Sequence, residues 1–409
     1  MEIREEQRER LREILRERIG RLGEISDEGI YREIDGLILE EAARAYLSLG
    51  QKRRLRTELF NSIRRLDLLQ ELVDDETVTE IMVNGTDGIF VERNGRIMPW
   101  ERRIPSREKL EDLVQQIAGS CNRIVNEAVP IADARLAGGE RVNLVLNPVA
   151  LNGPVITIRR FPHDPVDMQR LIDWGSITEE AALLLKKLVR AGYNIFISGG
   201  TGSGKTTFLN ALSDYIPKDE RIITIEDNAE LQIRGVANLV RLEARRGNTE
   251  GTHEITIRDL IKASLRMRPD RIIVGEVRGE EALDMLQSFN TGHDGSLSTG
   301  HGNSPRDMLS RLETMVLMGL ELPLAAIRRQ IASGIDILIH LGRMRDKTRK
   351  VLEILEVTGY DMDSGEIQTN PLFAFREEKD GAGDRVCGAL LKTGELTRTG
   401  KLERAGVEL

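Results

Sequence analysis

The segment that most constrains this chain is residues 199–206, Gly-Gly-Thr-Gly-Ser-Gly-Lys-Thr. An apolar run, Asn194–Ser198, precedes it and predicts a short buried strand, and a helix is expected to begin at Lys205. The spacing fits the phosphate-binding pattern G-x-x-x-x-G-K-[ST]. Glycines allow backbone N–H groups to approach phosphate oxygens, and a helix N-terminus attracts anions. A strand, a glycine-rich loop and a helix in this order therefore predict a nucleotide-phosphate site rather than a chance turn.

The residues of this loop have separate expected tasks. We expect Lys205 to reach the β- and γ-phosphates of ATP and the Thr206 hydroxyl to hold Mg²⁺. The residues expected to bind the nucleotide are Gly199, Gly200, Thr201, Gly202, Ser203, Gly204, Lys205, Thr206 and Thr207.

Composition narrows the class of protein. At 409 residues the chain can hold two or three domains, and 40% hydrophobic with 31% charged residues is typical of a globular protein. A net charge of −8 argues against a protein that coats nucleic acid. Cys121 and Cys387 form no metal or redox motif, which indicates free thiols in a reducing compartment. The sequence has neither an apolar run of about 18 residues nor a secretory signal, so we expect a cytoplasmic protein.

The pattern of elements predicts five segments. They are a helical N-terminal extension (1–70), an α+β domain (71–162), a linker (163–172), an α/β domain (173–375) and a polar C-terminal tail (376–409). The linker is placed where two prolines break the pattern, and the Gly- and Thr-rich tail is expected to be partly disordered. Strands and helices alternate in the α/β domain, which predicts a mostly parallel sheet covered by helices on both faces.

The extension begins with a charged helix whose apolar positions fall on one stripe, which favours packing on a neighbouring helix over binding a partner. Those positions are Leu11, Ile14, Leu15 and Ile19. In the α+β domain, strands are expected over 78–84, 89–93, 141–146 and 154–159, with a turn at Asn94–Gly95 and a helix over 107–122.

Four arginines of the α+β domain stand out because phosphoryl transfer uses arginines to neutralise charge, often from a neighbouring subunit. They are Arg135, Arg141, Arg159 and Arg160. Each one alone is more simply a surface residue. Their grouping before the linker supports the hypothesis that at least two of them reach the nucleotide.

The α/β domain is predicted in more detail. Strands are expected over 194–198, 221–226, 240–242, 271–275, 295–299 and 335–341, followed by 351–358 and 367–375. Helices are expected over 178–191, capped by Thr178, and from near Lys205, Thr256, Glu280, Pro305 and Pro323.

Two strand ends carry the expected catalytic acids. Glu276 follows the apolar run 271–275, where the usual terminal Asp is replaced by Gly275, and it could support the metal or orient water. Glu226 ends the run 222–226 and could polarise the attacking water. The alternatives are a solvent-exposed acid at Glu276 and a turn or capping acid at Glu226.

Two histidines, His293 and His301, flank the expected strand over 295–299. Metal ligation is disfavoured because no Cys or third His lies nearby. A histidine that senses phosphate or fixes a catalytic carboxylate is the favoured interpretation, and a purely structural role remains open for His293.

Together these segments resemble the ATPases of type II and type IV secretion and pilus assembly, over about residues 70–375. The phosphate loop matches their Walker A box, and the other boxes follow in the family's order. These are the acidic box at 225–230, the atypical Walker B box at 265–278 ending in Gly275-Glu276-Val277-Arg278, and the His box at 291–301. Segments 81–85, 290–296 and 303–307 make the chain look similar to the CpaF-like ATPases of Tad (Flp) pilus systems. The glycines at 300 and 302 depart from the family's usual neighbours of the last histidine.

The resemblance implies a RecA-like ATPase domain that assembles as a homo-hexamer. In such a ring Arg135, Arg141 and Arg159 would approach the γ-phosphate, Glu226 would activate water, and Glu276 would support Mg²⁺ and catalysis together with His301. The partner implied is an inner-membrane platform protein, which would hold the chain peripherally at the inner face of the cytoplasmic membrane. No nucleic acid is expected.

Two other functions remain open at this point. A P-loop protein that moves nucleic acid would need a basic channel, against which the acidic balance speaks. A nucleotide-gated scaffold with little turnover would not need Glu226 and Glu276.

Overall fold

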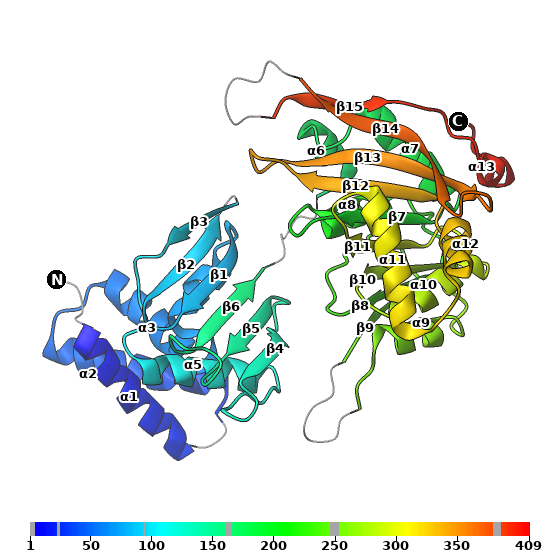
Figure 1. The fold of residues 1–409 in the computed structure, drawn as a ribbon. Helices are drawn as coiled ribbons and strands as arrows, with labels where there is room; N and C mark the ends of the chain where they lie inside the picture. Colours follow the sequence, from blue (N-terminus) through cyan, green and yellow to red (C-terminus); the bar gives the residue numbers. More distant parts are fainter. Residues whose placement is uncertain (1–4, 23–24, 94, 161–165, 246–252, 379–385) are drawn as a thin grey trace. The chain divides into compact units, whose positions relative to one another are not determined.

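A computed structural model describes residues 5–22, 25–93, 95–160, 166–245, 253–378 and 386–409. The predictions for Asn94 and for the proline-containing segment 161–165 lie outside the described residues. The chain forms two compact units, 1–163 and 164–409, and each is described by itself (Figure 1). Among the helices of the described residues, none combines the length and the apolar character needed to cross a bilayer.

The first unit begins with three helices that share a small apolar core. They are α1 (Glu5–Leu22), α2 (Asp27–Arg44) and α3 (Leu49–Arg64). The predicted stripe of α1 packs into this core, with Leu11 and Leu15 buried and Ile14 and Ile19 partly so. The short helices η1 (Asp67–Leu69) and α4 (Gln70–Asp74) follow.

A six-stranded antiparallel sheet completes the first unit, in the order β3-β2-β1-β6-β5-β4. Its elements are β1 (Val78–Asn84), β2 (Gly88–Arg93), β3 (Arg96–Pro99), α5 (Arg107–Ser120), β4 (Ile131–Arg135), β5 (Arg141–Val145) and β6 (Val155–Arg159). Alternate residues such as Ile81, Val142 and Ile158 pack with α5 in one core, and the residues between them face the other side. The predicted extension and α+β domain thus lie in one compact unit.

The second unit is built on a nine-stranded sheet, in the order β15-β14-β13-β12-β7-β11-β10-β8-β9. Its strands are β7 (Ile195–Gly199), β8 (Ile222–Glu226), β9 (Leu239–Glu243), β10 (Arg271–Val277), β11 (Leu297–His301), β12 (Ile337–Arg343), β13 (Arg349–Tyr360), β14 (Ile367–Glu377) and β15 (Gly388–Lys392). The strands from β12 to β9 are parallel, as predicted, and β13, β14 and β15 extend the sheet in antiparallel fashion.

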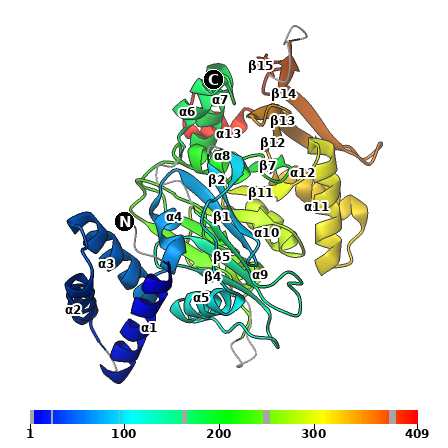
Figure 2. The same ribbon diagram turned by 90° about the vertical axis from the view of Figure 1, so that its left-hand side faces the viewer.

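Helices cover both faces of this sheet, which confirms the predicted α/β layering (Figure 2). They are α6 (Met168–Asp173), α7 (Glu179–Arg190), α8 (Lys205–Ser213), α9 (Ile257–Ser264), α10 (Glu281–Asn290), α11 (Pro305–Gly319), α12 (Leu324–Gly334) and α13 (Gly400–Ala405). In β7, Ile195 and Ile197 pack with α6, α7 and α8, whereas Phe196 packs on the opposite side with α9 to α12. The phosphate loop therefore grows from a strand that is buried on both faces.

Three sequence predictions are wrong in this unit. The predicted linker contains α6, whose Met168 and Leu171 are buried. The predicted tail contains β15 and α13, which bury Leu390 and Leu402 in the same core. Thr178 occupies the N-cap position of α7, as predicted, but the expected side-chain cap is absent because its hydroxyl donates to Leu390 O (3.3 Å). Few, widely spaced apolar residues hold these segments, so their periodicity was too weak to reveal them.

Candidate active site

The loop between β7 and α8 has the conformation that its glycines permit. Gly202 (φ +71°) and Gly204 (φ +93°) lie in the left-handed region, and Gly204 directly precedes the first turn of α8. The strand before the loop is buried throughout. The loop thus joins a rigid strand to a helix N-terminus, the arrangement that binds phosphate.

Lys205 is 92% buried, since only 8% of its surface is exposed. Its Nζ donates to Gly199 O (3.2 Å), Gly200 O (3.3 Å) and His301 Nδ1 (3.2 Å). Burial lowers the pKa of Lys205, and the Glu276 carboxylate opposes that effect. The ammonium is therefore held over the start of the loop, where a γ-phosphate would replace its weak carbonyl contacts.

His301 joins Lys205 to Glu276. Lys205 can only donate, so Nδ1 of the neutral imidazole accepts and the ring proton lies on Nε2. That Nε2 lies 2.7 Å from Glu276 Oε1. Burial lowers the pKa of His301, an effect that Glu276 partly offsets, and the lowered pKa favours the neutral imidazole. The structure thus brings together three predicted residues, from the ends of the neighbouring parallel strands β10 and β11 and from the start of α8.

Arg278 holds the other side of Glu276. Its Nη2 and Nε donate to Glu276 Oε2 at 2.7 and 3.1 Å. The hydrogen bond to Glu276 raises the pKa of Arg278. Glu276 is therefore not the solvent-exposed strand-end acid of the alternative interpretation, because both of its oxygens have cationic or imidazole neighbours.

Glu226 is almost fully buried, with 3% of its surface exposed. Its Oε1 accepts backbone hydrogen bonds from Glu230 (2.7 Å) and Leu231 (2.8 Å), whereas Oε2 has no partner among the described residues. Burial raises the pKa of Glu226 to about 7, and the two N–H donors oppose the rise. A buried carboxyl with one uncommitted oxygen and a pKa near neutrality suits a general base.

Gly275 explains the missing Walker B aspartate. A Cβ at this position would lie 2.9 Å from Glu226 Cγ, so only glycine leaves room for that side chain. The buried Thr299 hydroxyl on β11 donates to Gly275 O (2.8 Å), at the irregularity in the β10–β11 pairing between Val274 and Val277. The glycines beside His301 have a similar cause, because a Cβ on Gly300 would lie 2.9 Å from the Phe196 ring.

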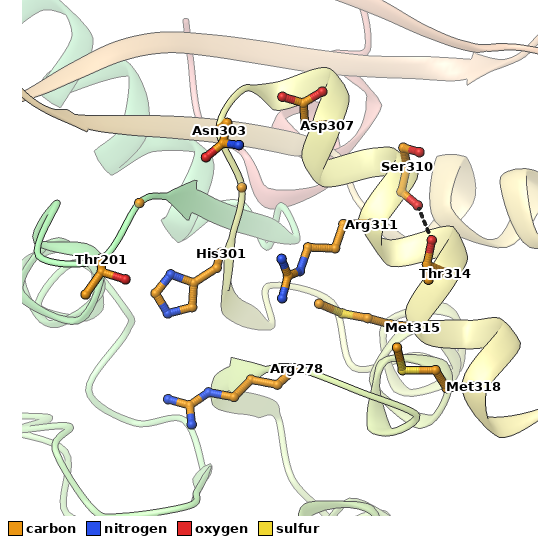
Figure 3. Close-up of a pocket in the computed structure, with 12 residues that line it drawn as sticks. Thr201, Arg278, His301, Asn303, Asp307, Ser310, Arg311, Thr314, Met315 and Met318 are labelled. Carbon is orange, nitrogen blue, oxygen red and sulfur yellow. Dashed lines mark hydrogen bonds between the residues drawn. The ribbon is translucent and has the colours of Figure 1, made fainter.

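A cavity of about 810 Å³ opens beside the loop, next to His301. Figure 3 shows Arg278, His301 and Arg311 extending into the same space, with Met315 and Met318 of α11 on one wall. Arg311 has no carboxylate partner among the described residues. The cavity combines cationic and apolar walls and adjoins Gly200 and Thr201, the first part of the loop.

Three of the four predicted arginines of the first unit lie in one row across its sheet. Arg135 is the register partner of Arg141, and Arg141 is the register partner of Arg159, on three adjacent strands. The next position in the row is Glu80. All three arginines alternate with the core residues of their strands and therefore lie on the face away from α5.

Two other candidates have structural contacts. Arg160 donates to the backbone oxygens of Val78 (3.1 Å) and Asp75, and so ties the end of β6 to the start of β1. His293 lies 3.3 Å from Ser288 O through Nδ1 and does not join the Glu276 cluster. Within the described ranges, no group of three or more His, Cys, Asp or Glu side chains is arranged to hold a metal.

The residues at the loop fit Mg²⁺ held mainly by a nucleotide. Thr206 offers a hydroxyl in the first turn of α8, and Glu276 offers a carboxylate whose Oε2 is hydrogen-bonded to Arg278. Its Oε1 lies 2.7 Å from His301 Nε2 but makes no hydrogen bond within the described residues. Such oxygen donors suit Mg²⁺, which keeps several waters and binds substrate phosphates. Glu276 would accordingly act through water.

Two residues at the site, Thr299 and Arg311, were not predicted from the sequence. Thr299 lies inside the predicted His-box strand, but its hydrogen bond to Gly275 depends on the pairing of β10 with β11. Arg311 lies on α11, and no local pattern marks it.

Comparison with known proteins places these features in a family. Residues 64–377 match the family described as type II/IV secretion system protein. A Mycobacterium tuberculosis protein named for conjugal transfer is 36% identical over 312 residues, which cover 75% of this chain and 87% of that protein. The type IV secretion system protein PtlH of Bordetella pertussis is 33% identical, with 71% of this chain and 93% of the relative covered.

The fold has a counterpart among solved structures. The Legionella pneumophila ATPase DotB superposes with a TM-score of 0.51 at 21% identity, over 70% of this chain and 79% of DotB. At this identity the likeness concerns the fold alone. With its intact phosphate loop, the chain is an ATP hydrolase, and it belongs to the type II/IV secretion system protein family.

Proposed function

We propose that this chain is an ATP-driven motor of pilus assembly or protein secretion. The observation that carries the proposal is the connection from Lys205 through His301 to Glu276, which couples the phosphate loop to two neighbouring strands. A γ-phosphate that draws Lys205 away would change this connection. Gain or loss of phosphate would thereby be transmitted to β10 and β11, as a motor requires.

The hydrolytic step follows from the positions of the acids. Water would attack the γ-phosphate in line, and Glu226 would orient it and accept its proton at the uncommitted Oε2. Lys205 would neutralise charge on the β- and γ-phosphate oxygens, and the loop N–H groups would hold the diphosphate. Mg²⁺, held by Thr206 and through water by Glu276, would supply further charge neutralisation when bound.

We further propose that the motor is a homo-hexamer in which sites are shared. The row of Arg135, Arg141 and Arg159 supports this, because three adjacent cations on an open sheet face suit a polyanion such as the γ-phosphate of a neighbouring subunit's nucleotide. Arg141 and Arg159 would neutralise transition-state charge, and Arg135 would bind the nucleotide. His301, which contacts both Lys205 and Glu276, would sense the γ-phosphate and transmit its presence to Glu276.

The cellular role is proposed more finely from the sequence resemblance. Segments similar to CpaF-like proteins favour the Tad (Flp) pilus, and the relatives' names support a place in a secretion machine. The motor would act at the inner face of the cytoplasmic membrane through an inner-membrane platform protein.

The direct test is Mg·ATP hydrolysis per protomer as a function of protein concentration, with and without DNA. A rate per protomer that rises steeply with concentration and is indifferent to DNA is expected for a ring with shared sites. A concentration-independent rate would contradict shared sites. Strong stimulation by DNA would contradict the proposed secretion motor and indicate a protein that moves nucleic acid.

A further inference from the structure

The hairpin that joins β12 to β13 brings two arginines beside the phosphate loop. Arg343 ends β12, Arg349 begins β13, and the two are register partners. Arg349 Nε donates to Gly202 O (3.1 Å). A Cβ on Gly202 would lie 3.8 Å from Arg343 Nη1, and one on Gly204 would lie 3.7 Å from Arg349 Cδ. Both side chains therefore border the second half of the loop.

These arginines lie on the opposite side of the loop from the catalytic acids. Strand β7 runs between β11 and β12, and Gly199 is the register partner of His301 on one side and Leu341 on the other. Arg343 follows Leu341 by two residues. Because His301, with Lys205 and Glu276, marks the γ-phosphate end, the hairpin borders the end of the site that holds the α- and β-phosphates.

The charges of the hairpin suit an anion. Like charges at directly opposite positions destabilise a strand pair. Neither Arg343 nor Arg349 has a carboxylate partner in the part of the chain that the structure describes. Arg345, in the same hairpin, is paired with Glu377. A phosphate group between Arg343 and Arg349 would offset their repulsion.

The hairpin is also held firmly in place. Asp346 Oδ1 accepts from the Thr348 backbone N–H (3.0 Å) and hydroxyl (2.6 Å), which closes the turn. Lys350 is buried and donates to Gly175 O (2.7 Å). These contacts position both arginines before any ligand arrives, so little ordering cost remains on binding.

We propose that Arg343 and Arg349 form a subsite for the α- and β-phosphates of nucleoside di- and triphosphates, supplied by the same chain that carries the loop. The proposal rests on the ATP hydrolysis assigned to that loop. It predicts that ADP and ATP share the contribution equally, because neither arginine borders the γ-phosphate end.

The test measures nucleotide affinity of the full chain by titration with a fluorescent ADP analogue, with ATP and adenosine as competitors. In Arg343→Gln, the Kd for ADP and that for ATP are each expected to rise about tenfold, as for loss of one charge-assisted contact. The Kd for adenosine is expected to stay within about twofold of the unmodified value. Lys347→Gln, at the tip of the same hairpin, removes one positive charge and is expected to match the unmodified chain.

Arg343→Gln is the decisive variant because it leaves the Arg349–Gly202 hydrogen bond in place. A Kd for ADP within about twofold of the unmodified value would overturn the subsite. A rise in Kd that occurs only in Arg349→Gln would mean that Arg349 stabilises the loop through its hydrogen bond to Gly202. That outcome would also overturn the subsite. An equal loss of adenosine affinity would place the arginines at the nucleoside and contradict phosphate recognition.

Three further measurements distinguish these outcomes. Thermal unfolding without nucleotide checks the fold, and Arg343→Lys, which keeps the charge but loses the planar fork, is expected to give an intermediate Kd. Lys205→Ala in the same titration tests the loop itself. If Lys205→Ala leaves ADP affinity and ATP turnover intact, the function assigned to the loop fails; if only the arginine variants are silent, the subsite alone fails.

Discussion

The cluster around Glu276 and the arginine row of the first unit organise charge in opposite ways. In the cluster, cations and acceptors alternate, so that Lys205, His301, Glu276 and Arg278 follow one another through contacts of 2.7 to 3.2 Å. In the row, like charges occupy directly opposite positions on adjacent strands. Such pairs destabilise a sheet, by about 0.2–1 kcal/mol each.

The difference indicates what each region needs in order to work. The cluster is already compensated, so its geometry can be set before substrate arrives. The row places three positive charges side by side on one face of the sheet, so its charge favours the approach of a phosphate. Substitutions in the cluster are expected to impair ATP hydrolysis within each chain. Substitutions in the row are expected to impair it only where two subunits share a site.

The largest effect is expected from Lys205→Ala. The variant loses the ammonium at the β- and γ-phosphates, and we expect ATP turnover to fall by at least about 10³-fold. Steady-state ATP hydrolysis measures it, with Lys262→Ala as a control for loss of an exposed lysine. Turnover equal to that of the control would mean that the loop takes no part in catalysis.

Glu226→Gln tests the proposed general base. The amide can still accept the N–H groups of Glu230 and Leu231, but it cannot take a proton from water. We expect kcat to fall by about 10²–10³-fold with nucleotide affinity nearly unchanged. Glu243→Gln is the matched control, since Glu243 is the register partner of Glu226 on β9. A parallel loss of ADP affinity would indicate a structural role instead.

The pH dependence of the same residue has a definite sign. The pKa of Glu226 is raised to about 7 by burial, and only the ionised form can act as a base. We expect kcat to rise about tenfold from pH 6 to pH 8 and to lose this dependence in Glu226→Gln. Because ionising the buried carboxyl is unfavourable, folding stability is expected to decrease as the pH rises from about 4.5 to about 7 and to level off above that.

The sequence predicted Lys205, Glu276 and His301 of the cluster and the arginines of the row, but neither the part of Arg278 nor the contacts that connect these residues. The loop and strand ends were accessible because local motifs fix them: Gly202 and Gly204 determine the turn, and β7 is apolar throughout. The arginine row required strand pairing, since Arg135 and Arg159 become near neighbours only through β5. Their grouping in sequence suggested proximity without specifying a row.

Contacts between distant segments were beyond sequence reasoning. Arg349 and Gly202 are separated by 147 residues, and Thr299 reaches Gly275 across a strand pair. The C-terminal segment was missed for a related reason. It is held by a few widely spaced apolar residues, such as Leu390 and Leu402, and by buried Glu356, which accepts hydrogen bonds from Thr397 and Arg398.

Arg141→Ala tests the row. Loss of one cation near the γ-phosphate is expected to lower kcat by about 10²-fold while ADP affinity stays unchanged. Arg96→Ala, on the exposed edge strand β3 of the same sheet, is the control. Mixing Arg141→Ala with Lys205→Ala chains should restore part of the activity, since some interfaces would pair an intact row with an intact loop. Mixtures no more active than either parent would contradict sites shared between subunits.

The smallest effect on activity is expected from Arg12→Met, which tests whether the N-terminal helices serve the fold of the first unit rather than its chemistry. Arg12 Nη2 lies 3.3 Å from Asp67 Oδ1, and Lys109 Nζ lies 2.8 Å from Oδ2. Asp67 is 5% exposed, so removing one cation leaves a buried carboxylate under-compensated. We expect the free energy of unfolding to fall by about 1–3 kcal/mol.

The same variant is expected to leave kcat and nucleotide affinity within about twofold of the unmodified chain, because Asp67 belongs to neither charged region. Arg21→Met, which removes an exposed cation from the same helix, should change neither stability nor activity. Thermal unfolding and ATP hydrolysis measure the two expectations. A large loss of kcat in Arg12→Met, with stability retained, would mean that the helices act on the arginine row, and the row would then be a regulated region rather than a fixed one.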